Sequence, residues 1–357
     1  MSIGFSADRW EAVKESHARW WSGELERPVV QLTVSSRDPG RPEPDLPFYG
    51  FTAFYDLSVS AEAIVDRWDY ELSCQHYFGD AFPCVLPNFG PGVAAAFLGC
   101  NLEQGNGTVW FHPAERKDIA DLHFEYDPDN IWLNRIKDIC RAAVDRWQGS
   151  VQVSMTDIGG PIDIISSFRP GTELLLDLYD HPDEVKRLTW EVHELWWKYF
   201  EEINAILAPV NPGYTAWASI LSPTPTYMLQ CDFCYMIGPE MFDEFVTPEL
   251  VASCKRLGNA FYHLDGPGEL PHLDSLLGIQ ELNGIQWVPG SGAPDFDQWP
   301  EVYRKIHSAG KLIQTFYQPY ILNAIVDQIG TGKGIVHLGC AKDEAEAREC
   351  LHKYGFE

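Results

Sequence analysis

The sequence has little positive charge, because 26 lysines and arginines stand against 52 aspartates and glutamates, and the formal net charge is -26 at pH 7. Charge of that sign repels nucleic acid and anionic membrane surfaces, so neither is expected as a partner. The sequence also lacks an uninterrupted apolar run of the roughly 20 residues that cross a bilayer, and a cationic start followed by an apolar stretch. We therefore expect a cytoplasmic protein.

Cysteine motifs are also scarce. The nine cysteines are scattered over 357 residues, which favours free thiols or metal ligands over a disulfide framework. Cys231 and Cys234 have Cys-x-x-Cys spacing, but no second pair completes a zinc site, and the surrounding pattern differs from that of a thioredoxin-like motif. The segment Thr331-Gly332-Lys333-Gly334 lacks the rest of a phosphate-binding loop and precedes a strand, so nucleotide binding is not expected there.

The sequence does contain a repeated alternation of short apolar strands and amphipathic helices. This alternation implies a parallel sheet, and close to eight strand-like segments favour a single closed (β/α)8 barrel of the TIM type. One domain is expected over residues 1–357, with an N-terminal helical extension over residues 1–27 and long early loops. The expected strands are 28–34, 81–86, 151–155, 214–220, 260–264, 284–288, 311–315 and 334–337, and the expected helices are 6–23, 61–73, 131–147, 173–180, 182–205, 239–257, 270–277, 298–309 and 321–329.

The segment Tyr262-His263-Leu264-Asp265-Gly266 carries the main candidate site, because active sites of such barrels lie at the carboxyl ends of strands. His263 and Asp265 alternate along the strand and so point the same way, which suits a divalent cation or an acid–base pair. The alternative is that His263 caps the strand and Asp265 stabilises the turn. Cys340 follows the last expected strand and would complete a His/Asp/Cys metal site with His263 and Asp265, unless it is a small buried apolar residue.

Other polar and aromatic residues follow the remaining strands. Asp232 is expected to act as a general base or a substrate acceptor, and a helix N-cap is its structural alternative. An aromatic rim would favour a flat substrate or a cationic methyl donor, whereas core packing or contacts within a homodimer would account for many of these rings equally well. The expected substrate-binding residues are Asn88, Asp157, Trp217, Tyr235, Gln286, Trp287, Gln314 and Tyr317.

The order of these motifs resembles that of the uroporphyrinogen decarboxylase-like superfamily, which includes the decarboxylase and corrinoid-dependent methyltransferases. The resemblance covers most of the chain from about Val151 onward. It implies a (β/α)8 barrel with its site around His263. The matching segments are Asp157 to Pro161, Leu178 to Val185, Cys231 to Phe233, Ile237 to Phe242 and Tyr262 to Gly266.

One departure distinguishes the branches of that superfamily, and a second concerns the expected zinc site. The Arg-Gln-Ala-Gly-Arg motif with which the decarboxylases resemble one another is missing, and a net charge of -26 disfavours their polyanionic substrate. The methyltransferase branch is similar in carrying zinc through a His-x-Cys pair and a late cysteine. His263 matches that histidine, Asp265 stands in place of the paired cysteine, and Cys340 is the late cysteine.

The expected function is therefore methyl transfer from a small O-methyl or N-methyl donor to a corrinoid held by a partner protein, with zinc as the expected metal. A cofactor-free lyase or decarboxylase that uses Asp232 and His263 as acid and base is the second hypothesis. A non-catalytic ligand-binding barrel is the third, and the many ionisable residues at the strand ends argue against it.

Overall fold

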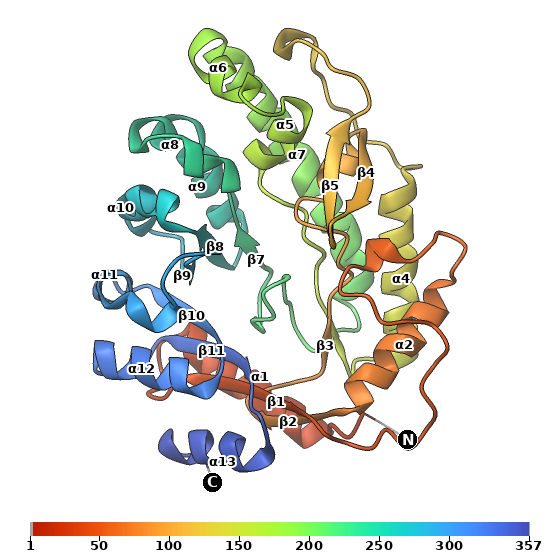
Figure 1. Ribbon diagram of the computed structural model, residues 1–357, viewed down its shortest axis with the longest axis vertical. Helices are drawn as coiled ribbons and strands as arrows, with labels where there is room; N and C mark the ends of the chain where they lie inside the picture. The colour runs from red at the N-terminus through yellow and green to blue at the C-terminus, as the bar shows by residue number, and fades with distance from the viewer. Residues whose placement is uncertain (1–2, 357) are drawn as a thin grey trace.

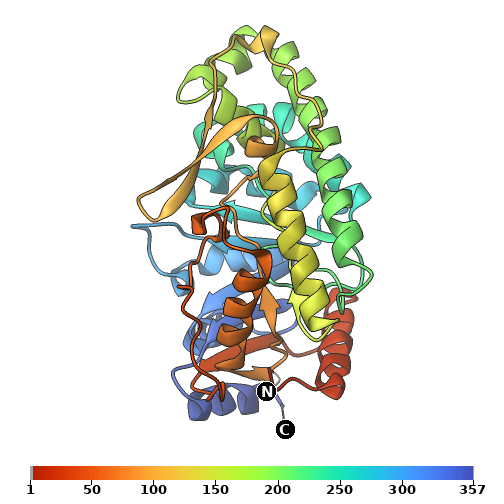
Figure 2. The same cartoon turned by 90° about the vertical axis from the view of Figure 1, so that its right-hand side faces the viewer.

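A computed structural model describes residues 3–356, in which helices alternate with strands (Figures 1 and 2). The α-helices are α1 Ala7–Trp21, α2 Ala61–Ser73, α3 Ala94–Phe97, α4 Ile131–Trp147, α5 Pro161–Phe168, α6 Glu173–Asp180, α7 Pro182–Leu207, α8 Pro239–Phe245, α9 Thr247–Arg256, α10 Leu273–Gly278, α11 Pro300–Ser308, α12 Pro319–Ile329 and α13 Glu344–Lys353. Short 3-10 helices are η1 Thr52–Phe54, η2 Ile119–Asp121, η3 Asp232–Met236, η4 Pro267–His272 and η5 Phe296–Gln298. None of the described helices is long and apolar enough to cross a membrane.

The central sheet is mostly parallel. Its strand order is β2-β1-β11-β10-β9-β8-β7, and only the β1–β2 pair is antiparallel. The strands are β1 Val29–Ser35, β2 Gln75–Gly79, β7 Thr226–Leu229, β8 Asn259–Asp265, β9 Gly284–Val288, β10 Leu312–Tyr317 and β11 Ile335–Cys340. Figure 1 shows α8 to α12 along the outer side of β7 to β11, with α2, α4 and α7 on the opposite side of the molecule.

Two smaller pairs of strands complete the described part of the chain. β3 Cys84–Val85 pairs in parallel with β6 Gln152–Val153, and β4 Cys100–Gly105 forms an antiparallel hairpin with β5 Thr108–Pro113. Within residues 3–356, no ladder joins β3 to β1 or β6 to β7. The mixed α/β fold and its mostly parallel sheet agree with the sequence-based expectation, but a closed barrel is not confirmed.

The expected strand at 214–220 is wrong. Residues 214–222 form an irregular segment closed by an isolated antiparallel bridge between Tyr214 and Ser222. Ala216, Ala218 and Ile220 are buried, and the Ala218 carbonyl reaches the side chain of Gln314 on β10. Because every second residue from Ala216 to Ile220 is buried, the sequence here alternates like that of a strand, although the segment forms no ladder. We call residues 214–222 the plug segment.

The register of β8, β9 and β10 sets three polar side chains level with one another. His263 is paired with Gln286, and Gln286 is paired with Gln314. Side chains of paired residues in neighbouring strands lie on the same face of a sheet. These three residues can therefore contact one another in a row across the sheet, and Asp265 follows His263 on the same face.

Candidate functional site

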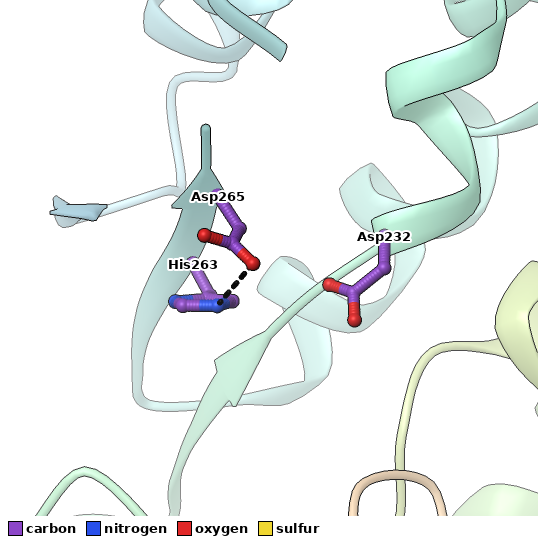
Figure 3. Close-up of side chains that lie close together, drawn as sticks. All are labelled: Asp232, His263 and Asp265. Atoms are coloured by element: carbon purple, nitrogen blue, oxygen red, sulfur yellow. Dashed lines mark ion pairs between the residues drawn. The ribbon is translucent and has the colours of Figure 1, made fainter. Parts of the chain in front are cut away.

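Asp232, His263 and Asp265 converge at the carboxyl ends of β7 and β8 (Figure 3). One potential ligand atom from each lies within 4.8 Å of the others, and His263 Nε2 is 4.0 Å from Asp265 Oδ2. This is the one such group of histidine, cysteine and carboxylate ligands found within the described residues. We call it the carboxylate–histidine triad. It offers two oxygens and one nitrogen, a donor set suited to a divalent cation.

A chain of hydrogen bonds fixes the proton on His263. The backbone carbonyl of Ala218 can only accept, and Gln314 Nε2 donates to it over 2.8 Å. Gln314 Oε1 then accepts from Gln286 Nε2, also over 2.8 Å, so Gln286 Oε1 is left to accept from His263 Nδ1. The proton of a neutral imidazole therefore sits on Nδ1, and Nε2 presents its lone pair.

Buried carboxyl groups hold the backbone at both acidic members of the triad. Asp163 accepts from the backbone N–H of Asp232 over 3.1 Å and from that of Phe233 over 2.8 Å. Glu269, at the start of η4, accepts from the backbone N–H of Asp265 over 3.1 Å. These hydrogen bonds to the backbone hold Asp232 and Asp265 in position, as such contacts do in sites that must keep their geometry.

The carboxyl groups around the triad are held toward their protonated forms. Burial and then repulsion by Asp232 raise the pKa of Asp157 to about 7. Burial raises the pKa of Glu269 to about 11, and it also raises the pKa values of Asp163 and Asp232. A bound cation would favour the charged forms of these carboxyls and reverse the direction of the shifts.

Three of the aromatic residues expected at the rim lie close to strand ends. Trp217, in the plug segment, meets the ring of His263 edge-to-face with a centroid distance of 5.1 Å. Tyr235 is exposed and lies against the turn at Gly266 and Gly268. Tyr317 ends β10 with a positive φ of 75° and is also exposed.

Other predicted residues lie apart from the triad or serve local contacts. Trp287 is fully buried and packs against Trp299, because it alternates with Gln286 and so faces away from it. Asn88 stabilises a turn, with its side-chain oxygen accepting from the Gly90 N–H and its amide donating to the Gly50 carbonyl. Asp157 accepts from the Gly159 N–H and the Tyr227 hydroxyl.

Cys340 is not grouped with His263 and Asp265. It ends β11, three strands along the sheet from β8, and its sulfur contacts Thr33 Oγ1 over 3.4 Å. Asp232 takes the third place in the triad instead. The zinc site with a thiolate that the family resemblance implies therefore has neither cysteine in place.

Cys231 and Cys234 flank Asp232 and are buried free thiols. A hydrogen bond from Cys231 lowers the pKa of Cys234 to about 6, and bonds from His272 and Tyr262 act in the same direction. The Cys234 sulfur is 3.7 Å from the Tyr262 hydroxyl. These contacts place the pair behind the triad, on the side of η4.

A cavity of about 660 Å³ lies next to Asp232, between η3 and the β4–β5 hairpin. Sequence reasoning missed the hairpin, whose turn at Asn106-Gly107 is a recognisable hairpin signal. It also missed the support given by Glu269, which no local pattern indicates. The cavity is lined by Pro91, Gly92, Thr108, Val109, Trp110, Phe111, His112, Asp163, Ser166, Ser167, Arg169, Pro170, Gly171, Gln230, Asp232, Phe233 and Met236.

No protein-family model matches this chain, and no curated protein sequence matches it. The evidence for function is therefore the geometry of the triad, its supporting residues and the cavity beside it.

Proposed function

We propose that the chain is an enzyme that binds a divalent cation at Asp232, His263 and Asp265 and moves a methyl group from a small donor to a corrinoid on a partner protein. The observation that carries the proposal is the hydrogen-bond chain from Ala218 to His263. It leaves the Nε2 lone pair of His263 beside two carboxylates, which is the arrangement that a metal ligand requires.

The donor set of the triad fits a divalent cation without a thiolate. Two carboxylates and one imidazole suit zinc, manganese or iron, and three protein ligands leave positions open for a substrate. Such a cation would act as a Lewis acid on the oxygen of an O-methyl donor, whereas the nitrogen of a protonated N-methyl donor has no free lone pair and would leave as a neutral amine. Methyl transfer breaks the bond from the donor's oxygen or nitrogen to the methyl carbon; the oxygen or nitrogen keeps the electron pair, and the carbon bonds to cobalt(I), which supplies two electrons.

The chain's own residues would orient the donor and limit access of water. Trp217 covers one side of His263, and the buried amides of Gln286 and Gln314 keep the imidazole in one orientation. The position of the site supports an enzyme, because the carboxyl ends of parallel strands are where α/β proteins bind substrates.

We also propose that the central sheet and the β3–β6 pair form an interrupted (β/α)8 barrel. The plug segment would lie beside β6, because the Met155 N–H donates to the Thr215 carbonyl.

Metal analysis of the purified protein tests the first half of the proposal. We expect about one divalent ion per chain, lost in His263→Ala and retained in Cys340→Ala, which removes the cysteine outside the triad. Retention of the ion in His263→Ala, or its absence after incubation of the protein with zinc, manganese and iron(II), would contradict the proposed site.

A methyl-transfer assay tests the second half. The metal-loaded protein is incubated with reduced cobalamin and a panel of methyl ethers and methylamines, and methylcobalamin is followed by absorbance. We expect its formation with at least one donor in the wild type and a loss of at least about a hundredfold in His263→Ala. A panel with no active donor, repeated with the corrinoid protein as methyl acceptor, would overturn the assignment.

A lyase or decarboxylase is a second candidate, favoured by the unprotonated Nε2 of His263 beside a carboxyl group. It predicts carbon dioxide release from a carboxylated substrate after chelation of all metal. A non-catalytic protein predicts instead that His263→Ala and Asp265→Ala change no measured activity.

A further inference from the structure

The cavity beside Asp232 has acidic groups but little positive charge to balance them. Asp163 and Asp232 both line it. Arg169 is the one lysine or arginine in the lining, and its guanidinium is paired with Asp177 over 2.7 Å and with Glu173 over 3.2 Å. The positive charge of Arg169 is therefore already balanced, which disfavours an anionic ligand.

Gln230 lines the same cavity and carries a hydrogen-bond acceptor that is not used. The residue is only 5% exposed, and its buried Oε1 has no hydrogen-bond partner among the described residues. A buried acceptor left without a donor costs about 1–3 kcal/mol, so such groups commonly mark a place where a ligand or water donates. The missing partner must carry an N–H or O–H.

Two serine hydroxyl groups of the cavity are already committed as donors. Ser166 Oγ donates to the Asp163 carbonyl over 2.7 Å, and Ser167 Oγ donates to the same oxygen over 3.2 Å. Their oxygens remain available only as acceptors. Around Asp163 the cavity therefore offers mainly hydrogen-bond acceptors, and a bound cation would favour the charged forms of Asp163 and Asp232.

Aromatic side chains form another part of the wall. Trp110 on the β4–β5 hairpin is 54% exposed although it is large and apolar, and Phe111 and Phe233 line the same cavity. The face of an aromatic ring attracts an alkylated cation, and it also packs against methyl groups. Aromatic faces, carboxyl groups and a free acceptor together suit a ligand that has methyl groups, a positive charge and a hydrogen-bond donor.

We infer that this cavity binds a small methylated ammonium ion that carries at least one N–H, with the charge facing Asp163 and Asp232 and the N–H directed to Gln230. The net charge of -26 would also draw such a cation toward the protein. The inference rests on the proposed function in one respect, because it chooses N-methyl over O-methyl donors. The binding site itself does not depend on turnover.

Three probes of nearly the same shape separate charge from hydrogen bonding. Protonated N,N-dimethylethanolamine has both the charge and an N–H, choline has the charge without an N–H, and 3,3-dimethylbutan-1-ol has neither, while the hydroxyl group that all three share cancels in the comparison. Calorimetry with the wild type should give Kd values that rise in that order, with about tenfold or more between the first and the last. Equal Kd values for the three probes, or no binding of the first, would overturn the inference.

Variants assign the preference to residues of the cavity. Gln230→Met keeps the volume and should abolish the preference for dimethylethanolamine over choline, whereas Gln328→Met should preserve it, since Gln328 also has a buried unpartnered Oε1 but lies on α12. Trp110→Ala should raise the Kd values of both cations about threefold or more. Trp190→Ala, at another exposed tryptophan, should leave these Kd values unchanged. A preference unchanged in Gln230→Met would exclude the assigned hydrogen bond.

These experiments distinguish a failure of the ammonium site from a failure of the proposed methyl transfer. Ammonium selectivity without any methylcobalamin formation would leave the cation site in place and reject methyl transfer. Methylcobalamin formation from ethers, with no selectivity among the three probes, would support methyl transfer and reject the ammonium site.

Discussion

Gly160 lies so close to Gln230 that a β-carbon added to the glycine would stand 2.1 Å from the Gln230 backbone oxygen. Gly160 is the N-cap of α5, the helix that carries Asp163, so this contact fixes the start of that helix against the end of β7. We predict that Gly160→Ala lowers the free energy of unfolding by about 1–3 kcal/mol, because backbone must move to admit the methyl group. Urea denaturation followed by circular dichroism measures the loss.

Gly238 provides the matched control. It is the N-cap of α8 and also precedes a proline, but no atom lies within 4 Å of its added β-carbon. Gly238→Ala should change the free energy of unfolding by less than about 0.5 kcal/mol. Equal losses in the two variants would show that the Gln230 contact is not the cause.

The amide of Gln286 should control metal affinity without touching the metal. Gln286→Leu removes the acceptor for His263 Nδ1, so the imidazole can rotate or place its proton on Nε2. We predict a metal affinity about 10- to 100-fold lower, measured by competition with a chelator.

Gln31→Leu tests whether any buried glutamine would have this effect. Gln31 is 2% exposed on β1 and contacts His17 over 2.8 Å, away from the triad. The variant should lose stability and keep its metal affinity. A similar fall in affinity for both variants would argue against a specific role of Gln286.

Asp265 should determine which metals the triad prefers. Asp265→Cys replaces a hard carboxylate by a soft thiolate and creates the His-x-Cys pattern that the resemblance to the methyltransferase branch implies. We predict that selectivity for zinc over manganese rises by at least about tenfold, whereas Cys340→Ser, outside the triad, leaves selectivity unchanged. Unchanged selectivity in Asp265→Cys would mean that residue 265 is not a ligand.

Local sequence patterns predicted many elements of this fold. Gly284–Val288, Ala61–Ser73 and Ile131–Trp147 occur at the expected residues, because β-branched runs and helical periodicity fixed them locally. The plug segment could not be told from a strand, since alternate burial is common to both. No helix was expected at α5, because Gly159, Gly160 and Pro161 are common turn residues, although proline also suits a first helical position.

Only the part of the candidate site that lies on one strand was predictable, because it follows from the alternation of side chains along that strand. His263 and Asp265 were expected to face the same way, and they do lie together in the triad. Whether Asp232 or Cys340 joins them depends on which strand ends are neighbours, which is a tertiary property. The row from His263 through Gln286 to Gln314 needs the register of three strands, so sequence spacing could not reveal it.

Asp157 should make the stability of the protein depend on pH. Its folded-state pKa is raised to about 7, mainly by burial, whereas an aspartate in an unfolded chain titrates near pH 4. Between these values the folded state keeps a proton that the unfolded state has released. The free energy of unfolding should therefore fall as the pH rises from about 4 to about 7.

Asp157→Asn isolates this contribution, because asparagine cannot ionise and still offers an oxygen to the Gly159 N–H and the Tyr227 hydroxyl. We predict that the variant loses less stability than the wild type over this range, by up to about 4 kcal/mol, since each pKa unit is worth about 1.4 kcal/mol. Urea denaturation at several pH values measures the difference. Asp274→Asn, at an 80% exposed side chain paired with Lys305, should follow the wild type. Identical pH profiles for the wild type and Asp157→Asn would mean that burial does not hold the proton on Asp157.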